Sequence, residues 1–527
     1  MTEAATGPIV YFGDSMTDGG NLFAITSQLL TLPFPLASFG YSENVTNGRN
    51  YADVATGLLG ADELNFAIGG ARAVGERTLG SAVDPGVSGN FLVENPDQSL
   101  LDLDINLGGQ VSRYLATLAQ GAAPASAASI FIGLNDFNRF TPSNPLDPAQ
   151  TAAEAAALAG SVAAATLGAA AALAQAGVGT IILNTLPLAS FFPSFKFAPP
   201  LIQALGDQVI SGYNDALVAQ SAQLSALGVT VKIVDLEAVA AEVAADPSAF
   251  GFVTVSEQLF FGTAADPIII EGPEGPLPFF PSNPAVEGLH PDQFAFYDLF
   301  HPTEAMHETF GVFTAESLTS EVSILTDGSD RFRGTGAEEL VLAKAGHDRI
   351  DLGGGDDVAL AGLGNDKVSG GKGSDIVSGG AGNDNLNGNI GDDFIGGGAG
   401  NDFVNGGAGH DALADGLGAD LLIGGGGNDV FFHTEASLLG GGKSFDLFIG
   451  GGGRDTLVLT LTDETAEAMA GKVESYNGRF AYFRELGLTA IGIEEIVVRK
   501  IGDDVSDLGL TGDLADRVAE ADLWGFV

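Results

Sequence analysis

A nine-residue period governs the second half of the chain. From Leu325 to Phe432 the sequence divides into twelve units without an insertion, such as GGAGNDNLN at 379–387 and GGAGNDFVN at 397–405. The eighth position of every unit is apolar. The sixth position is always acidic, and reads Asp330, Glu339, Asp348, Asp357, Asp366, Asp375, Asp384, Asp393, Asp402, Asp411, Asp420 and Asp429. A disordered linker rich in glycine does not keep an apolar residue fixed in each unit, so the period predicts an ordered repeat.

The chemistry of one unit indicates its conformation. Glycines allow positive φ, so the first six residues are expected to form a turn, and the last three a short strand with one apolar side chain pointing inward. Two units then close one coil, and successive coils stack at the strand spacing of ~4.8 Å. This stacking places the sixth-position carboxylates in two rows.

Rows of carboxylates ~5 Å apart repel one another, and the turn carbonyls need partners. A hard cation with six or more oxygen ligands meets both needs, and calcium fits this role better than magnesium, which demands a strict octahedron. The eleven sixth-position aspartates are therefore the predicted ligands of several structural Ca²⁺ ions.

This region resembles the calcium-binding β-roll of RTX proteins over residues 325–459. The phase is lost after Phe432, although residues 445–459 still resemble the end of such a roll, with Asp455 one position short of the phase that Asp429 sets. Residues 460–527 contain no repeat and end in the acidic stretch DLADRVAEADLWGFV. The resemblance implies that this C-terminal region carries an uncleaved secretion signal, that type I secretion machinery exports the chain, and that the protein is extracellular.

Composition excludes several kinds of site and partner. The chain has no cysteine, which rules out disulfides, thiolate zinc sites and a cysteine nucleophile. Its 68 acidic and 21 basic residues give a net charge of -47, which repels nucleic acid and anionic membrane surfaces. We therefore expect no nucleic-acid partner.

Two segments bear on targeting. Residues 1–8 have neither a basic nor an apolar region, so a cleaved N-terminal signal is not expected. The uncharged stretch 155–183 is rich in alanine and is interrupted by Gly177 and Gly179 before Thr180-Ile181-Ile182. This pattern predicts a helix, a glycine stop and a buried strand, and no transmembrane segment.

The region before the repeat, 1–320, alternates between apolar strands and helical segments. Strands are predicted at 9–12, 64–68, 129–132, 180–183 and 229–234, with helices at about 108–120, 151–176 and 203–226. Such alternation predicts a three-layer α/β domain with a parallel sheet and helices on both faces. Binding and catalytic sites in these sheets lie at the carboxyl ends of the strands. We thus expect three regions: an α/β domain over 1–320, an all-β roll over 325–459, and a C-terminal cap with the secretion signal over 460–527.

Four short motifs stand after strands or near the end of the first region. They are Gly13-Asp14-Ser15, Gly69-Gly70, Gly133-Leu134-Asn135-Asp136 and Asp298-Leu299-Phe300-His301-Pro302. In this order they resemble the SGNH/GDSL hydrolase family, over roughly residues 7–315. The resemblance implies a flavodoxin-like fold and a serine ester hydrolase without an organic cofactor. The chain has no GxSxG motif, which argues against an α/β-hydrolase.

The resemblance also implies roles for particular residues. Ser15 is the expected nucleophile, His301 the base that takes its proton, and Asp298 the residue that orients the imidazole. The oxyanion is expected to be bound by the N–H groups of Ser15 and Gly70 and by the amide of Asn135.

Three of these assignments leave alternatives. Gly70 is preferred over Gly69 because of its distance from Asn65, which is that of the family's motif. His290 also follows an acid-x-x-His-Pro pattern, but His301 is preferred because Asp298 precedes it and an apparent helix follows. His307 is expected to be a packing or surface residue.

The remaining polar residues of these motifs have simpler interpretations. Asp14 and Asp18 are expected to fix the turn after the first strand. Residues 47–49, Asn-Gly-Arg, could contact substrate or form a structural turn.

The chain has 34 phenylalanines, several of them in the proline-rich segments 187–200 and 273–284. The clusters are Phe191, Phe192, Phe195, Phe197, Phe260, Phe261, Phe279 and Phe280. They either fill the core or line an apolar, acyl-accepting mouth. The predicted function is a secreted serine carboxylester hydrolase acting on lipid or acyl esters. The alternatives are a polysaccharide O-acetyl esterase and a non-catalytic, calcium-stiffened adhesin or surface-layer protein.

Overall fold

The computed structural model forms two compact units. One comprises residues 1–240 and 256–318, and the other comprises residues 241–255 and 319–527. The structure describes residues 7–19, 21, 24, 49–68, 71–75, 77–78, 98–137, 140, 142–144, 147–196, 198–245, 247–250, 252, 254–258, 268–272, 275–279, 294–296, 301–435, 444–476, 478–500, 508, 510 and 513–523.

A five-stranded parallel sheet forms the centre of the first unit, and its strand order is β2-β1-β3-β4-β5. This is the flavodoxin-like order, so the predicted fold class is confirmed. The strands are β1 (Ile9–Gly13), β2 (Glu63–Asn65), β3 (Ala127–Phe131), β4 (Thr180–Asn184) and β5 (Thr230–Val234).

The second strand ends earlier than the sequence predicts. It stops at Asn65, whose side-chain oxygen accepts the N–H of Ala67 and whose amide donates to the carbonyl of Thr17. Beyond Asn65 the backbone still bonds to β1, because the N–H groups of Phe66 and Ile68 donate to the carbonyls of Tyr11 and Gly13 at 2.9 and 3.3 Å.

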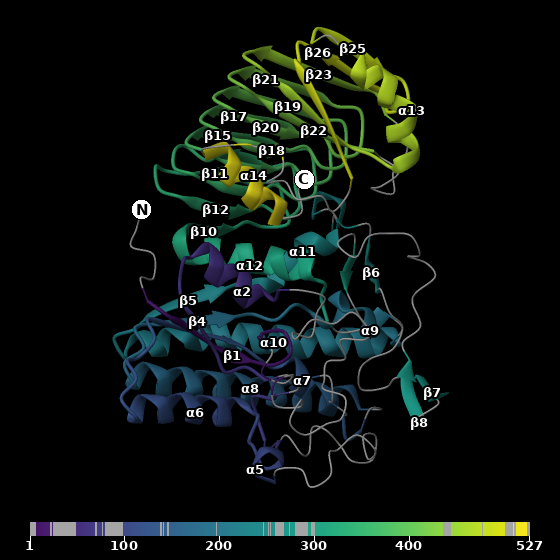
Figure 1. Ribbon diagram of the computed structural model, residues 1–527. Coiled ribbons are helices and arrows are strands. Elements are labelled where there is room, and N and C mark those ends of the chain that lie inside the picture. The colour runs from purple at the N-terminus through teal and green to yellow at the C-terminus, as the bar shows by residue number, and fades with distance from the viewer. Residues whose placement is uncertain are drawn as a thin grey trace. The chain divides into compact units, whose positions relative to one another are not determined.

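Helices cover both faces of the sheet, with α6, α8 and α10 on one side and α2 and α12 on the other (Figure 1). The helices of this region are α2 (Tyr51–Leu58), α5 (Gln98–Leu101), α6 (Leu107–Ala119), α7 (Leu134–Phe137), α8 (Pro148–Gln175), α9 (Pro193–Lys196), α10 (Pro200–Ser225), α11 (Leu236–Ala245) and α12 (Glu304–Thr319), with 3-10 turns η2 (Ala189–Phe191) and η3 (Pro247–Phe250). Short strands β6 (Thr254–Gln258) and β9 (Phe294–Phe296) form one pair, and β7 (Ile268–Gly272) and β8 (Gly275–Phe279) form another.

Helix α8 is long and apolar enough to cross a membrane by length and composition alone. In this fold it packs against α10 and α6. Asp147 caps its start by accepting the N–H groups of Ala149 and Gln150, and Gly177, with a φ of 98°, follows its end. The predicted order of helix, glycine stop and buried strand is confirmed.

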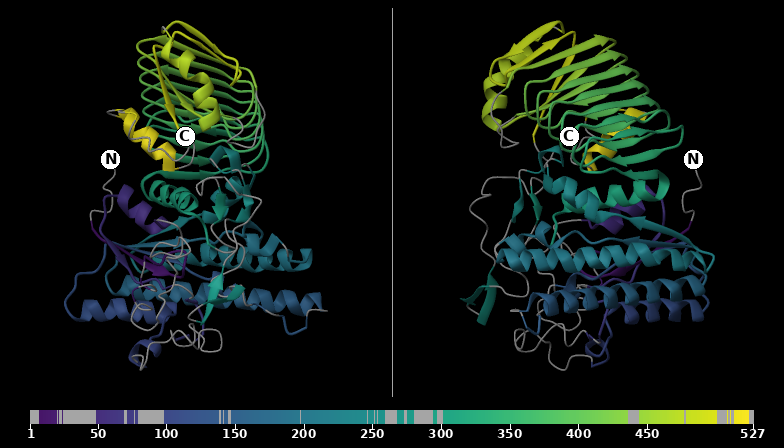
Figure 2. Two further views of the ribbon diagram at one scale, coloured as in Figure 1. Left: turned by 45° about the vertical axis from the view of Figure 1, so that its right-hand side comes forward. Right: turned by 180° about the vertical axis from the view of Figure 1, so that it is seen from behind.

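The second unit contains two sheets of nine strands each, in which neighbouring strands run parallel except for one antiparallel pair at the end of the second sheet. Each strand pairs with the strand two units further along the chain, as Val341 does with Ala359 and Val368 with Leu386, which confirms that two units close one coil. Figure 2 shows the coils stacked along the roll. One sheet contains β10 (Glu321–Ile324), β12 (Glu339–Leu342), β14 (Val358–Leu360), β16 (Ile376–Ser378), β18 (Phe394–Gly396), β20 (Ala412–Ala414), β22 (Val430–Thr434), β24 (Thr456–Thr460) and β27 (Glu495–Arg499). The other contains β11 (Arg331–Arg333), β13 (Arg349–Asp351), β15 (Lys367–Lys372), β17 (Asn385–Ile390), β19 (Phe403–Ala408), β21 (Leu421–Gly426), β23 (Asp446–Gly452), β26 (Leu488–Ile491) and β25 (Phe480–Phe483).

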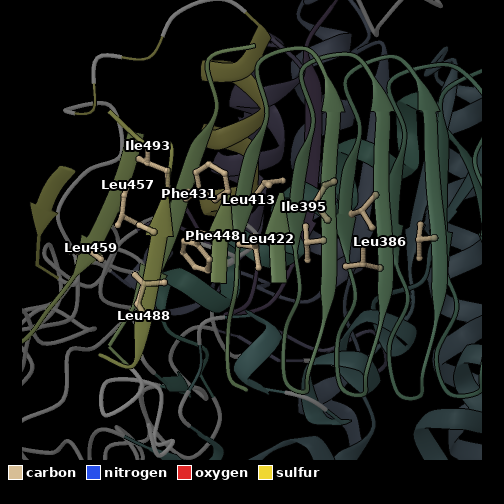
Figure 3. Close-up of a cluster of buried hydrophobic side chains, with 14 of the residues drawn as sticks. Leu386, Ile395, Leu413, Leu422, Phe431, Phe448, Leu457, Leu459, Leu488 and Ile493 are labelled. Atoms are coloured by element: carbon tan, nitrogen blue, oxygen red, sulfur yellow. The ribbon is translucent and has the colours of Figure 1, made fainter. Parts of the chain in front are cut away.

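The eighth-position side chains form the core of the roll. Leu386, Ile395, Leu413 and Leu422 are fully buried and stack between the two sheets (Figure 3). The turns depend on glycine: Gly364 has a φ of 141°, and a Cβ there would lie 1.4 Å from the carbonyl oxygen of Gly346 in the preceding coil. Backbones this close tolerate no side chain, which explains why glycine recurs in the turn.

The outer faces of the two sheets differ. All three residues of β14, β16 and β20 are buried, whereas the exposed and buried residues of β15, β17 and β19 largely alternate. Helix α14 (Asp513–Leu523) packs against β18, and its apolar residues Leu514, Val518 and Ala521 are buried. The sequence carries a signal for this asymmetry, because the seventh and ninth positions are mostly apolar in alternate units.

The roll continues past the strict repeat. Leu447 pairs with Leu421, and Leu457 pairs with Phe431, so both sheets extend across the point where the phase shifts. Helix α13 (Asp463–Glu474) follows, and β26 and β27 then add one more strand to each sheet.

Candidate active site and calcium rows

Ser15 stands in a tight turn directly after β1. The carbonyl of Asp14 accepts the N–H groups of Thr17 and Asp18, and its side-chain Oδ1 accepts the N–H of Met16 at 3.2 Å. Asp18 accepts the N–H of Asn21 at 2.6 Å. The prediction that Asp14 and Asp18 fix this turn is confirmed.

The structure brings Ser15 and His301 together. The Nε2 atom of His301 lies 3.1 Å from the Oγ of Ser15, and both residues are partly exposed. This distance permits proton transfer between a hydroxyl and an imidazole. A serine activated in this way can attack an electrophilic carbon.

Asn135 lies in α7, just after β3, and its side chain is next to the buried Asp14 carboxylate. Since β1 and β3 are neighbours at the point where the strand order reverses, Ser15 and Asn135 lie where ligands bind in open α/β sheets. Gly70, Asp298 and His290 lie outside the described residues.

A buried glutamine holds the backbone just before the turn that contains Ser15. Gln110 of α6 accepts the N–H of Gly13 at 3.0 Å and donates to the carbonyls of Gly13 at 2.7 Å and Ile105 at 3.0 Å. All polar atoms of this amide group are thus used to fix the end of β1. Sequence reasoning missed Gln110, since one glutamine on a helix carries no recognisable spacing.

Asp136 fixes the loop that follows the Gly69-Gly70 motif. Its carboxylate accepts the N–H of Ala73 at 2.8 Å and of Val74 at 3.2 Å. Burial raises the pKa of Asp136 to about 6 and that of Asp14, its neighbour, to about 7. Asp136 belongs to the same motif as Asn135, so the sequence drew attention to this position. It did not indicate a role for the aspartate.

Two other predictions concern residues around this site. Arg49 forms ion pairs with Glu304 and Glu308 of α12, which favours a structural role for that turn; Asn47 and Gly48 lie outside the described residues. His307 was expected to be a packing or surface residue; it is 1% exposed, so it packs in the interior, and burial lowers its pKa to about 3.

Two of the phenylalanines in question fill the core. Phe191 and Phe192 are buried, and both rings pack against Phe296, with centroid distances of 5.1 and 5.7 Å. Phe197, Phe260, Phe261 and Phe280 lie outside the described residues.

The sixth-position carboxylates form the two predicted rows. The N–H of each aspartate donates to Oδ1 of the aspartate one coil later, as Asp366 does to Asp384 at 2.7 Å and Asp375 to Asp393 at 2.9 Å. The rows extend beyond the predicted set, since Asp420 donates to Asp446 at 3.1 Å and Asp429 to Asp455 at 2.9 Å. Sequence reasoning did not count Asp446 and Asp455 as ligands because the constant spacing of the earlier rows changes at this point.

The second oxygens of these carboxylates fit a cation. Within the described residues, several buried Oδ2 atoms have no hydrogen-bond partner: those of Asp348, Asp357, Asp366, Asp375, Asp393, Asp402, Asp411, Asp420, Asp429 and Asp455. Burial raises the pKa of Asp393 to about 8. A buried carboxylate oxygen without a donor requires a proton or a positive charge, and closely spaced oxygens of this kind suit Ca²⁺.

Asp330, the first member of its row, differs from the rest. It is only partly buried, and its Oδ2 accepts the N–H of Thr326 at 2.8 Å and the hydroxyl of the same residue at 2.7 Å. These bonds lower its pKa. The Oδ2 atom of Asp330 therefore has partners within the protein, unlike the ten Oδ2 atoms named above.

Comparison with known protein families gives two matches. The model of the GDSL-like lipase/acylhydrolase family matches residues 9–311, which is more than half of the chain. The RTX calcium-binding nonapeptide repeat matches four segments, 326–359, 333–368, 369–404 and 405–434. No curated protein matches the chain.

Proposed function

Because the chain belongs to the GDSL-like lipase/acylhydrolase family and carries calcium-binding RTX repeats, we propose that it is a secreted serine carboxylester hydrolase. The observation that carries this proposal is the 3.1 Å contact between Ser15 Oγ and His301 Nε2. The first unit supplies the chemistry, and the roll supplies calcium-dependent folding.

In the proposed reaction, His301 accepts the proton of the Ser15 hydroxyl as Oγ attacks the acyl carbon of the ester. The N–H groups of Ser15 and Gly70 and the amide of Asn135 bind the oxyanion of the tetrahedral intermediate. His301 then gives its proton to the leaving alcohol, and an acyl group remains on Ser15. Water activated by His301 releases the acid, while Asp298 orients the imidazole throughout.

We propose a lipid or other acyl ester as the substrate, and the support for this lies in the sequence. The segments 187–200 and 273–284 are rich in proline and phenylalanine, and positions 268–270 are three consecutive isoleucines. Apolar segments of this kind suit an acyl chain better than a glycan. Phe191 and Phe192 do not add to this support, because they pack in the core.

Hydrolysis of p-nitrophenyl esters of graded chain length tests the reaction and its substrate together. We expect turnover by the wild-type chain to rise with acyl length, and both turnover and labelling by a fluorophosphonate probe to disappear in Ser15→Ala. Equal turnover by Ser15→Ala would overturn the proposal. A preference for acetylated glycan would select the O-acetyl esterase, and an unlabelled wild-type chain would select the adhesin.

We also propose that the C-terminal region directs export through type I secretion machinery and that the roll folds outside the cell. Extracellular calcium modules bind at ~10⁻⁴–10⁻³ M, so a roll of this kind stays unfolded where calcium is scarce. The buried Oδ2 atoms without donors support this coupling, because only a proton or a cation makes their burial favourable. Secretion of the intact chain by a host with the transporter, and its loss when residues 460–527 are removed, would test the route.

A further inference from the structure

Two residues of the roll break the repeat at the same position in consecutive coils. From Gly370 to Phe432 the first position of every unit is glycine, except in the unit that begins with Asp415. His433 stands two units after Asp415, where the next coil would again have glycine. Four earlier units begin with Leu325, Ala343, Leu352 or Ala361, so Asp415 and His433 are distinguished by being polar residues in the part of the roll where this position otherwise holds glycine.

The glycine at this position has a structural reason. A Cβ on Gly397 would lie 2.8 Å from Oδ2 of Asp402, and one on Gly388 would lie 2.1 Å from Oδ2 of Asp393. The missing side chain therefore leaves room for the carboxylate of the same unit. At position 415 the unit carries a second carboxylate instead, and Asp415 lies close enough to the row to act electrostatically on Asp402 and Asp420.

The structure joins these departures to the end of that row. The residues Asp415, His433 and Asp446 are buried, with exposures of 2%, 4% and 3%. The Nδ1 atom of His433 is in hydrogen-bond contact with Oδ2 of Asp415, and one potential ligand atom from each of the three residues lies within 4.8 Å of the other two. Asp446 also accepts the N–H of Asp420 through Oδ1, and Ser444 Oγ lies 3.4 Å from both of its oxygens.

The two ring nitrogens of His433 have different surroundings. His433 Nε2 is buried and has no hydrogen-bond partner within the described residues. The imidazole packs edge to face near Phe448, with ring centroids 6.1 Å apart, so its orientation is set by an apolar neighbour. Because Nδ1 is the ring nitrogen that contacts Asp415, an ion bound by both residues would take the place of the proton between Nδ1 and the Asp415 carboxylate, and Asp446 places a ligand atom within reach of both.

Charge points to a cation as well. Asp402, Asp415, Asp420 and Asp446 influence one another electrostatically, and one imidazolium supplies a single positive charge against four carboxylates. A divalent ion would offset this local excess of negative charge.

We propose that Asp415, His433 and Asp446 bind a divalent transition-metal ion of the Zn²⁺ class, in addition to the calcium rows. Imidazole nitrogen with carboxylate oxygen suits Zn²⁺ and its neighbours, whereas Ca²⁺ prefers oxygen ligands alone. Three protein ligands and one further oxygen complete a tetrahedral Zn²⁺ site with ligand distances of ~2.0–2.2 Å. The nine-residue phase ends at Phe432. The ion would join Asp415, which precedes this point, to His433 and Asp446, which follow it.

The test uses the full-length chain without a histidine tag, saturated with millimolar Ca²⁺ and then exposed to micromolar Zn²⁺ or Co²⁺. Bound metal is measured by elemental analysis after gel filtration, and the visible spectrum of Co²⁺ reports a four-coordinate site. We expect one equivalent of tightly bound Zn²⁺ in the wild-type chain. The variant His433→Gln should bind it more weakly by a larger factor than the ~10–100-fold typical for loss of an outer-shell partner.

Two further variants make the result decisive. Asp415→Gly restores the residue of the repeat, so it should keep the calcium-dependent fold and still lose the ion, even if His433→Gln folds poorly. His410→Gln changes a histidine on the exposed surface of the same roll and should bind Zn²⁺ as the wild type does. Absence of bound Zn²⁺ in the calcium-saturated wild type, or equal binding by Asp415→Gly, would overturn the proposal and leave a buried Asp415–His433 pair.

Discussion

His301 Nε2 approaches Ser15 Oγ to 3.1 Å across 286 positions of the chain. Since the proposed nucleophile depends on this contact, Ser15→Ala should reduce kcat by at least ~10⁴-fold on any ester that the chain hydrolyses. Steady-state kinetics on a p-nitrophenyl ester check this. Ser112→Ala, which changes an exposed serine on α6, is the matched control and should leave kcat unchanged. A similar loss in both variants would mean that folding, and not Ser15, is affected.

Asp136→Asn should lower kcat by ~10–100-fold with little change in KM. The loss should be smaller than the ~10²–10³-fold for an oxyanion donor, because Asp136 acts through the loop that it holds. Its carboxylate accepts two backbone N–H groups, and an asparagine side chain offers a single acceptor oxygen. Asp147→Asn, which keeps a helix-capping side chain at the start of α8, serves as the control. If Asp136→Asn raised KM with kcat intact, the loop would contribute to substrate binding instead.

The first unit should lose stability in acid because of His307. Its folded-state pKa of about 3 lies below the unfolded value of ~6.5, so the unfolded chain binds the extra proton between these pH values. The contribution of His307 is therefore intact above pH ~6.5 and falls as the pH drops, by ~2 kcal/mol at pH 5. His307→Leu should flatten this part of the curve of Tm against pH. An unchanged slope would show that His307 is not responsible.

The calcium-free roll should respond to pH in the opposite direction. Burial raises the folded-state pKa of Asp375 to about 7 and of Asp393 to about 8, so protonation stabilises the folded form. Without calcium this stability is present in acid and is lost as the pH rises through 7 and 8. Circular dichroism in EDTA should show strand structure that declines from pH 5 to pH 8 and returns at pH 8 with millimolar Ca²⁺. Equal signals at pH 8 in EDTA and in calcium would contradict this coupling.

Deletions should distinguish a whole coil from half of one. Removing 379–396 takes out two units, and the strands on either side keep their own sheets and their register of two units per coil. We expect its calcium-induced fold to persist. Removing 388–396 alone moves every later unit to the opposite sheet. Apolar outer residues such as Val430 would then lie on the outer face of the other sheet, which is more exposed. This second variant should fail to fold in calcium, and equal folding of both would show that the two faces are interchangeable.

The sequence predicted the roll and the parallel sheet because both are built from local patterns. A nine-residue phase repeats within the reach of one coil, and each strand of the sheet is a short apolar run bounded by polar residues or glycine. The Ser15 motif was found because it stands directly after such a run, and the His301 motif because an aspartate and a helix flank it. Features of this kind can be read from neighbouring residues alone.

The remaining features depend on contacts between distant segments. Gln110 and Asp136 bind backbone groups of other segments, and no spacing marks such partners. No spacing marks Asp446 either, because it takes its place in the carboxylate row after the nine-residue phase has shifted. The cover of α14 over β18 brings together segments that are far apart in the chain, which a single sequence does not encode locally.

In both carboxylate rows the hydrogen bonds run in one direction along the roll, because the N–H of each acidic residue donates to the carboxylate of the following coil. Asp455 is the last aspartate of its row, and no further coil follows to accept its N–H. The carboxylate of Glu494, outside the repeat, accepts that N–H instead, at 2.8 Å. Strand β25 then runs antiparallel to β26 and finishes the sheet. A chain cut before this closing segment would present a bare parallel edge whose donors match the first coil of another copy. The residues after the repeat thus supply, at the last coil, the hydrogen-bond partners that a further coil would otherwise provide.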